Sequence, residues 1–228
     1  MTAPVGPPSP AVAKKVLAQS PPMDIYIALV HHPVLNRAGD VVTTAVTNID
    51  IHDLARAART YGVSGYFLIT PIEQQRAMVS RIAAHWQGTG GESLHPLRAD
   101  ALSLVRVVPT LADAERAVTG AAGHPPLLVG TSARRLETTV GYGALRARLT
   151  TEEGAALLLF GTGWGLTAET LAGCPVVLPP IEAIAGRAGY NHLSVRSAVA
   201  IILDRLLGAH EGHTGPPPGT GPLPGVDR

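Results

Sequence analysis

Residues 190–207 read YNHLSVRSAVAIILDRLL, a polar segment followed at once by an apolar one. Ile201 and Leu207 lie off the main apolar stripe of the second part, so the predicted helix is apolar on two sides. We expect this helix to pack on a core and against a further surface, and to end at Gly208 in the left-handed conformation. The stripe has the three- and four-residue spacing of one helix face and consists of Val195, Ala198, Val199, Ile202, Leu203 and Leu206.

The polar part of this stretch would lie at the N-terminus of the predicted helix. Free backbone N–H groups at a helix start can bind a ligand, and the side chains of residues 190–194 and of Arg196 would surround them. Spacing alone favours the simpler alternative, in which Ser194 caps the helix and its neighbours face solvent.

The composition indicates one α/β domain that does not depend on a basic tail. Of the 228 residues, 46% are apolar and 4% aromatic, which is typical of a parallel sheet covered by helices. The net charge of +1 restricts any nucleic-acid binding to a local patch. A single cysteine, Cys174, excludes an internal disulfide and favours a reducing compartment, so we expect a cytoplasmic protein. No apolar run approaches the length of a membrane span, and we expect no membrane partner.

The chain divides into a central domain and two terminal segments. Residues 23–208 carry the apolar periodicity of a folded α/β domain, whereas residues 1–22 and 209–228 are rich in Pro, Ala and Gly and are predicted to be disordered. Runs of strand length separated by helical patterns predict a mostly parallel sheet flanked by helices. These runs cover residues 24–30, 65–69, 104–108, 126–130, 156–160 and 175–179.

Two helix boundaries carry recognisable signals. The segment TPIE at residues 70–73 fits a capping box, with Thr70 as N-cap and Glu73 at the third helical position. The segment DIHDLARAARTYG places apolar residues on one helix face and is predicted to end at Gly62.

Ligands of such sheets bind beyond the carboxyl ends of the strands, so the loops at those ends are the candidate sites. The loop at 31–48 is long, polar and rich in Thr, and long ordered loops are commonly functional. The other candidates are residues 131–135, the Gly-rich segment 161–169 and residues 180–194.

The Gly-rich segment GTGWGL lets backbone amides approach a ligand closely, although a purely structural turn is as good an interpretation. It is not GxGxxG and lacks the Lys-Ser/Thr pair of a P-loop, which argues against an ordinary dinucleotide or nucleoside-triphosphate site. No Ser nucleophile elbow and no zinc spacing occur in the sequence, so neither triad hydrolysis nor a metal is expected.

Three segments together resemble a known cofactor site. FGTGWGL (160–166), LPPI (178–181) and YNHLSVRSAVAIILDRLL (190–207) resemble the three-part site of the SPOUT class of S-adenosylmethionine-dependent RNA methyltransferases. Upstream, ALVHHPV, GDVVTTAVTNIDIHDLARAARTYGV and TSAR resemble one bacterial SPOUT subfamily, so the resemblance spans nearly all of residues 23–208.

The resemblance implies a fold, a cofactor and an assembly. SPOUT enzymes thread the C-terminal segment into a deep trefoil knot, a rare exception to unknotted topology, and bind S-adenosylmethionine there without metal. They are usually homodimers whose C-terminal helices form part of the interface. The residues that the resemblance assigns to the cofactor are Thr131, Ser132, Ala133, Phe160, Gly161, Thr162, Gly163, Trp164, Gly165, Leu166, Leu178, Pro179, Ile181, Tyr190, Asn191, His192, Leu193 and Ser194.

The substrate side of the resemblance is an RNA, with transfer RNA favoured over ribosomal RNA by analogy to the bacterial guanine-N1 enzyme of the same class. Arg134, Asn191 and Arg196 are expected to carry catalysis, with Arg134 binding a phosphate and Arg196 orienting the acceptor or the cofactor carboxylate. Each arginine is alternatively an ordinary surface residue, and Asn191 and His192 alternatively shape the pocket only.

The Thr-rich loop at residues 43–48 supplies further candidates for RNA binding. Thr44, Thr47 and Asn48, together with Arg134, are expected to bind the RNA, while an ordinary hydrogen-bonded loop weighs equally. A protein that binds RNA or nucleotides without catalysing transfer is the rival function.

Overall fold

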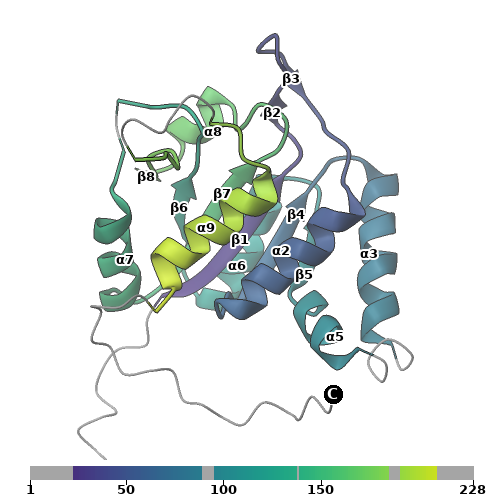
Figure 1. Ribbon diagram of the computed structural model, residues 1–228. Coiled ribbons are helices and arrows are strands. Elements are labelled where there is room, and N and C mark those ends of the chain that lie inside the picture. The colour runs from purple at the N-terminus through teal and green to yellow at the C-terminus, as the bar shows by residue number, and fades with distance from the viewer. Residues whose placement is uncertain (1–22, 89–94, 138, 185–190, 210–228) are drawn as a thin grey trace, which may run out of the picture.

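A computed structural model describes residues 23–88, 95–137, 139–184 and 191–209. Its centre is a six-stranded parallel sheet in the order β5-β4-β1-β7-β6-β8 (Figure 1). Each strand coincides, apart from small shifts at its ends, with a run that the sequence predicts, so the mostly parallel α/β sheet is confirmed. The strands are β1 (Asp24–Val30), β4 (Gly65–Ile69), β5 (Val105–Val108), β6 (Leu127–Gly130), β7 (Ala155–Gly161) and β8 (Val176–Val177).

Helices cover both faces of the sheet, which explains why its central strands are apolar throughout. In β1, Ile25, Ile27 and Leu29 join one core cluster, whereas Tyr26 and the alternate residues after it join the other. In Figure 1, α2 and α9 lie in front of the sheet and α6 behind it. The helices are α2 (Asn48–Thr60), α3 (Glu73–Gln87), α5 (Pro96–Leu102), α6 (Leu111–Ala122), α7 (Tyr142–Thr151), α8 (Ala168–Ala172) and α9 (Val195–Leu207).

A short hairpin, β2 (Val34–Leu35) and β3 (Val41–Val42), occupies the long loop after β1, where the sequence indicated no strand. Its turn is held by hydrogen bonds between Asn36 and Asp40: the Asn36 N–H donates to the Asp40 carbonyl at 2.9 Å, and the Asp40 N–H donates to Asn36 Oδ1 at 2.9 Å. Gly39 supplies the left-handed φ of +90° that the turn requires. The long loop after β1 therefore contains an ordered hairpin closed by its own hydrogen bonds.

The ends of α2 follow from its sequence. Thr47 is the N-cap, and its hydroxyl accepts a hydrogen bond from the Asp50 N–H at 3.4 Å. After the helix, Gly62 has a φ of +68°, which confirms the predicted end.

The capping box predicted at Thr70 is wrong. α3 begins at Glu73 with Ile72 as N-cap and no side-chain cap. Thr70 is fully buried, and its N–H donates to the Val108 carbonyl at 3.1 Å, which continues the pairing of β4 with β5. Thr70 therefore belongs to the end of the sheet and does not cap α3.

The helix predicted from the C-terminal stretch is α9, and its N-cap is confirmed. Ser194 Oγ accepts a hydrogen bond from the Ser197 N–H at 3.2 Å. The left-handed end predicted at Gly208 is wrong: its φ is −66°, and its carbonyl accepts a hydrogen bond at 2.7 Å from Arg146 of α7. This contact holds Gly208 in an extended conformation.

Parts of the predicted architecture fall outside the described residues. Residues 185–190, on the path of the expected trefoil knot, are among them, so the knot stays a prediction. The same holds for the disorder expected of residues 1–22 and of nearly all of 209–228.

Candidate cofactor and substrate site

A cavity of about 810 Å³ opens at the carboxyl ends of β1, β6 and β7, where parallel sheets of this kind bind ligands. Its volume lies within the range of about 300–1,000 Å³ that is usual for small-molecule sites. Its walls come from the β2–β3 hairpin, the loop into α2, the loops that follow β6, β7 and β8, and the start of α9.

The Gly-rich loop after β7 is built into the hairpin. The Leu35 N–H donates to the Gly165 carbonyl at 2.9 Å, and the Trp164 N–H donates to the Leu35 carbonyl at 2.9 Å. A Cβ on Gly161 would lie 2.5 Å from the Leu166 nitrogen, so this turn closes only around glycine. The hairpin and the Gly-rich loop thus form one continuous wall.

Two glycines of this wall have different roles. A Cβ on Gly163 would lie 2.9 Å from the Leu35 carbonyl oxygen, so the missing side chain makes room for the hairpin. Gly165 also lines the cavity, but a Cβ there would meet no atom within 4 Å. The open backbone at Gly165 is where a ligand can approach closely.

A chain of side-chain hydrogen bonds connects three segments below this wall. Thr162 Oγ1 donates to the Val30 carbonyl at 3.0 Å and lies 2.5 Å from Thr44 Oγ1, which lies 2.9 Å from His31 Nδ1. Because each hydroxyl carries one proton, Thr44 donates to Thr162 and His31 Nδ1 donates to Thr44. His31 Nε2 is then an acceptor; it is buried and has no partner among the described residues.

His31 is neutral at physiological pH. Burial lowers its pKa to about 4, and the charge of Asp50 acts in the opposite direction. The ring is fully buried and contributes to the cavity lining. An uncharged acceptor therefore lies beside the site.

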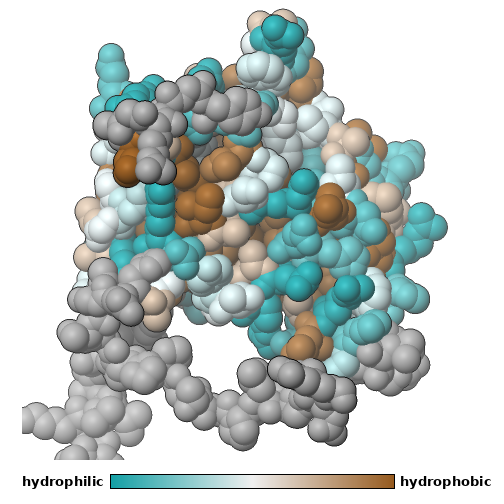
Figure 2. Space-filling view, viewed as in Figure 1, coloured by the Kyte–Doolittle hydropathy of each residue, from teal (hydrophilic) through white to brown (hydrophobic). Residues whose placement is uncertain are grey.

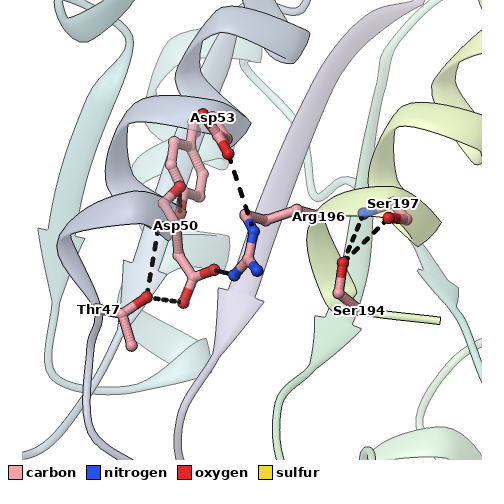
Figure 3. A network of polar contacts seen from close by, with 7 residues as sticks. Thr47, Asp50, Asp53, Ser194, Arg196 and Ser197 are labelled. Carbon is pink, nitrogen blue, oxygen red and sulfur yellow. Dashed lines mark hydrogen bonds and ion pairs between the residues drawn. The ribbon is translucent and has the colours of Figure 1, made fainter. Parts of the chain in front are cut away.

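An ion pair fixes the start of α9 against α2 (Figure 3). Arg196 Nη1 lies 2.5 Å from Asp50 Oδ1, and Arg196 Nε lies 3.8 Å from Asp53 Oδ2. The Asp50 side chain is only 7% exposed, and its second oxygen accepts a hydrogen bond from the Thr47 hydroxyl. The charge of Arg196 is thus balanced within the protein.

Hydrogen bonds connect the loop after β6 both to β7 and to the segment before α9. Thr131 Oγ1 donates to the Leu159 carbonyl at 2.8 Å, and the Arg134 N–H donates to Ser132 Oγ at 3.0 Å. Asn191 Nδ2 donates to the Ala133 carbonyl at 3.4 Å, which connects this loop to the segment before α9.

The structure brings together most of the residues that the sequence assigned to the site. Leu166 and Leu178 are buried but lie outside the cavity lining, and Tyr190 lies outside the described residues. The predicted site residues that line the cavity are Thr44, Thr47, Thr131, Ser132, Ala133, Arg134, Phe160, Gly161, Thr162, Gly163, Trp164, Gly165, Pro179, Ile181, Asn191, His192, Leu193, Ser194 and Arg196.

Three residues predicted to bind RNA, Thr44, Thr47 and Asn48, are either hydrogen-bonded within the protein or lie outside the cavity lining. The hydroxyls of Thr44 and Thr47 are engaged with His31, Thr162 and Asp50, as an ordinary hydrogen-bonded loop would have them. Asn48 is exposed at the first position of α2 and does not line the cavity. Their binding to RNA stays a prediction.

Sequence reasoning missed three parts of the lining. Asp50 and His31 line the cavity, but no motif in the sequence assigned either of them to the site. The hairpin turn, residues 35–39, was missed as an element, although Asn, Gly and Asp between apolar pairs are an available turn signal.

Comparison with known proteins identifies the family. Residues 24–208 match the model of a family described as SAM-dependent RNA methyltransferase. The chain belongs to this family, which confirms the membership in an RNA methyltransferase family that the resemblance implied. S-adenosylmethionine is accordingly the cofactor of its family.

Three individual proteins are similar to this chain in sequence or in fold. A tRNA (guanine-N(1)-)-methyltransferase of Oleidesulfovibrio alaskensis is 42% identical over 86% of this chain, but the match covers only 45% of that protein. An uncharacterized protein of Aquifex aeolicus is 38% identical over 81% of this chain and 88% of its own length. A probable methylase family protein of Haemophilus influenzae shares the fold, with 22% identity, a TM-score of 0.51 and coverage of 81% of this chain and 65% of that one.

The residues present fit S-adenosylmethionine. The loop at Thr131–Ala133 offers N–H and C=O groups of the kind that an adenine edge requires. Gly165 leaves open space for the ligand, although its own N–H and carbonyl are bonded to Thr162 and Leu35. Pro179, Ile181 and Ile202 offer apolar surface. The buried acceptor at His31 Nε2 lies beside this lining. Within the described residues, we find neither a cluster of metal-binding side chains nor a helix long and apolar enough to cross a membrane.

Proposed function

We propose that this chain transfers the methyl group of S-adenosylmethionine to a nucleotide of a structured RNA, with transfer RNA as the preferred class. One observation carries the proposal: the Gly-rich loop, the loop after β6 and the segment before α9 converge on one cavity in a chain of this family. When bound, the cofactor supplies an electrophilic methyl group on its sulfonium.

The residues have separate roles in this proposal. The loops at 131–133 and 161–165, with Pro179 and Ile181, hold the cofactor, and Asn191 fixes the closing segment on Ala133. Arg196, held by Asp50, orients the acceptor or the cofactor carboxylate. Positioning the nucleophile in line with the methyl group is the main contribution that the protein makes.

The target RNA is the finer part of the proposal. The chain spans about half the length of the tRNA (guanine-N(1)-)-methyltransferases that it matches: 45% and 43% in the two relatives. The match alone therefore does not assign guanine-N1 activity to this segment. Transfer RNA is preferred because both relatives are named for it.

We further propose a cytoplasmic homodimer that uses α9. Ile201 and Leu207 are only half-buried in the single chain, and apolar side chains lie along α9 on the side of α7 and β6 (Figure 2). A second copy covering this surface would explain why the helix is apolar beyond one face.

The test is methyl transfer from labelled S-adenosylmethionine to RNA from cells that lack the gene, followed by mapping of the modified nucleotide. Calorimetry measures cofactor binding on the same preparation. We expect transfer to the transfer-RNA fraction and one cofactor per subunit. Cofactor or RNA binding without transfer to any fraction would support the rival, a non-catalytic binding protein.

A further inference from the structure

The cavity lining carries an excess of positive charge at two particular side chains. Its charged residues are Arg37, Arg134 and Arg196, with Asp50 as the acidic residue among them. Asp50 pairs with Arg196, which leaves Arg37 and Arg134. Neither of these two guanidinium groups has a hydrogen-bond or ion-pair partner among the described residues. Arg135 differs from its neighbour, because it is paired with Glu182.

The cofactor does not explain this excess. S-adenosylmethionine has one carboxylate against an ammonium and a sulfonium, so it is net positive and gains nothing from two unbalanced cations nearby. A nucleic-acid strand carries one negative charge per nucleotide and is attracted by such cations. The excess therefore fits the second substrate.

The two arginines lie on different sides of the cofactor loop. Arg37 is in the hairpin that follows β1, and Arg134 is in the loop that follows β6. In the sheet, β7 lies between β1 and β6, so the Gly-rich loop after β7 separates the two. A strand that contacts both would cross the mouth of the cavity over the Gly-rich loop.

Arg37 is presented on a rigid support. The hairpin turn is closed by hydrogen bonds between Asn36 and Asp40, including Asn36 Nδ2 to Asp40 Oδ2 at 3.0 Å, so the nearest carboxylate in sequence is already engaged. The hairpin is also bound to the Gly-rich loop through Leu35. A support held at both ends lowers the entropy cost of fixing the arginine on a ligand.

We propose that Arg37 is a substrate-positioning residue that binds an RNA phosphate on the hairpin side of the cavity, opposite the phosphate bound by Arg134. The proposal rests on the proposed function, since it assumes an RNA substrate. It assigns to the β2–β3 hairpin the placement of the target nucleotide over the cofactor loop.

The experiment measures binding of bulk transfer RNA, isolated from a strain that lacks the gene, at several salt concentrations. Arg37→Ala and Arg134→Ala should each reduce the slope of log affinity against log salt by about one unit, and the double variant by about two. Arg37→Lys should keep the slope, because it keeps the charge. Arg116→Ala, on α6 and outside the cavity lining, is the matched control and should leave the slope unchanged.

Cofactor titration on the same variants separates the possible causes. Affinity of Arg37→Ala for S-adenosylmethionine should stay within about twofold of the unmutated protein, while its apparent KM for RNA rises more than its kcat falls. An unchanged salt slope in a folded Arg37→Ala protein, or a cofactor affinity that falls in step with RNA affinity, would overturn the assignment. Failure of the unmutated protein to transfer methyl groups would instead refute the proposed function, and the slopes would still be measurable.

Discussion

The ion pair between Arg196 and Asp50 should be worth a measurable share of the stability of the domain. Arg196→Met removes the guanidinium and leaves the Asp50 carboxylate, 7% exposed, with the Thr47 hydroxyl. Breaking a fully buried pair costs about 3–5 kcal/mol. The Arg196 side chain is 34% exposed, so we expect a smaller loss, about 2–3 kcal/mol of the free energy of unfolding. At about 2–4 °C per kcal/mol, the melting temperature should fall by about 4–12 °C.

A double-mutant cycle tests this reasoning. Urea unfolding of Arg196→Met, Asp50→Asn and the combined variant should show a coupling of about 1–2 kcal/mol, because the second change removes a charge that the first has left without its partner. Arg148→Ala removes an exposed pair with Glu152 on α7 and should cost under about 1 kcal/mol. If the loss in the combined variant equals the sum of the two single losses to within about 0.5 kcal/mol, the pair is not a source of stability.

Three further predictions concern other parts of the fold. As pH falls from about 6.5 to about 4, His31 becomes protonated in the unfolded state but stays neutral in the folded protein, so the free energy of unfolding should fall by about 3 kcal/mol. Thermal melts of His31→Asn with the same pH dependence as the unmutated protein would contradict this. Gly163→Val should abolish cofactor binding in calorimetry by displacing the hairpin from Leu35, whereas Gly120→Ala, in open space on α6, should leave binding unchanged; normal binding by a folded Gly163→Val protein would exclude the loop from the site. Ile201→Asp with Leu207→Asp should shift a homodimer toward monomer in light scattering, and a monomeric unmutated protein at micromolar concentration would refute the proposed interface.

The sheet and most of the cavity lining were predictable because local patterns carry them. Strand runs such as residues 24–30 are apolar throughout, and the polar segment before α9 is adjacent in sequence to the helix that it serves. The pairing of Arg196 with Asp50 was not predictable in this way, since the two lie far apart in sequence and each looks like a surface residue. Thr70 shows the opposite failure: a good local capping signal lost to a long-range strand pairing.

The hairpin shows a third limit. Its strands are two residues each, too short for a periodicity to emerge, and its position depends on backbone bonds to Gly165 and Trp164. The resemblance assigns Gly163 to the cofactor, but the space beside its Cα is occupied by the Leu35 carbonyl of the hairpin. Such packing is a property of the assembled fold.

The place of β7 in the sheet sets the order in which the cavity can form. β7 pairs with β1 along its whole length, yet the two are about 130 residues apart in the chain, and its other edge pairs with β6. Contacts of such long sequence separation close late in folding, because the loop entropy has to be lost first. The strands that follow one another, β1, β4 and β5, can assemble on one side before β7 arrives. We therefore expect the hairpin to reach its final position only when β7 inserts, so that ligand binding becomes possible at the last stage of folding.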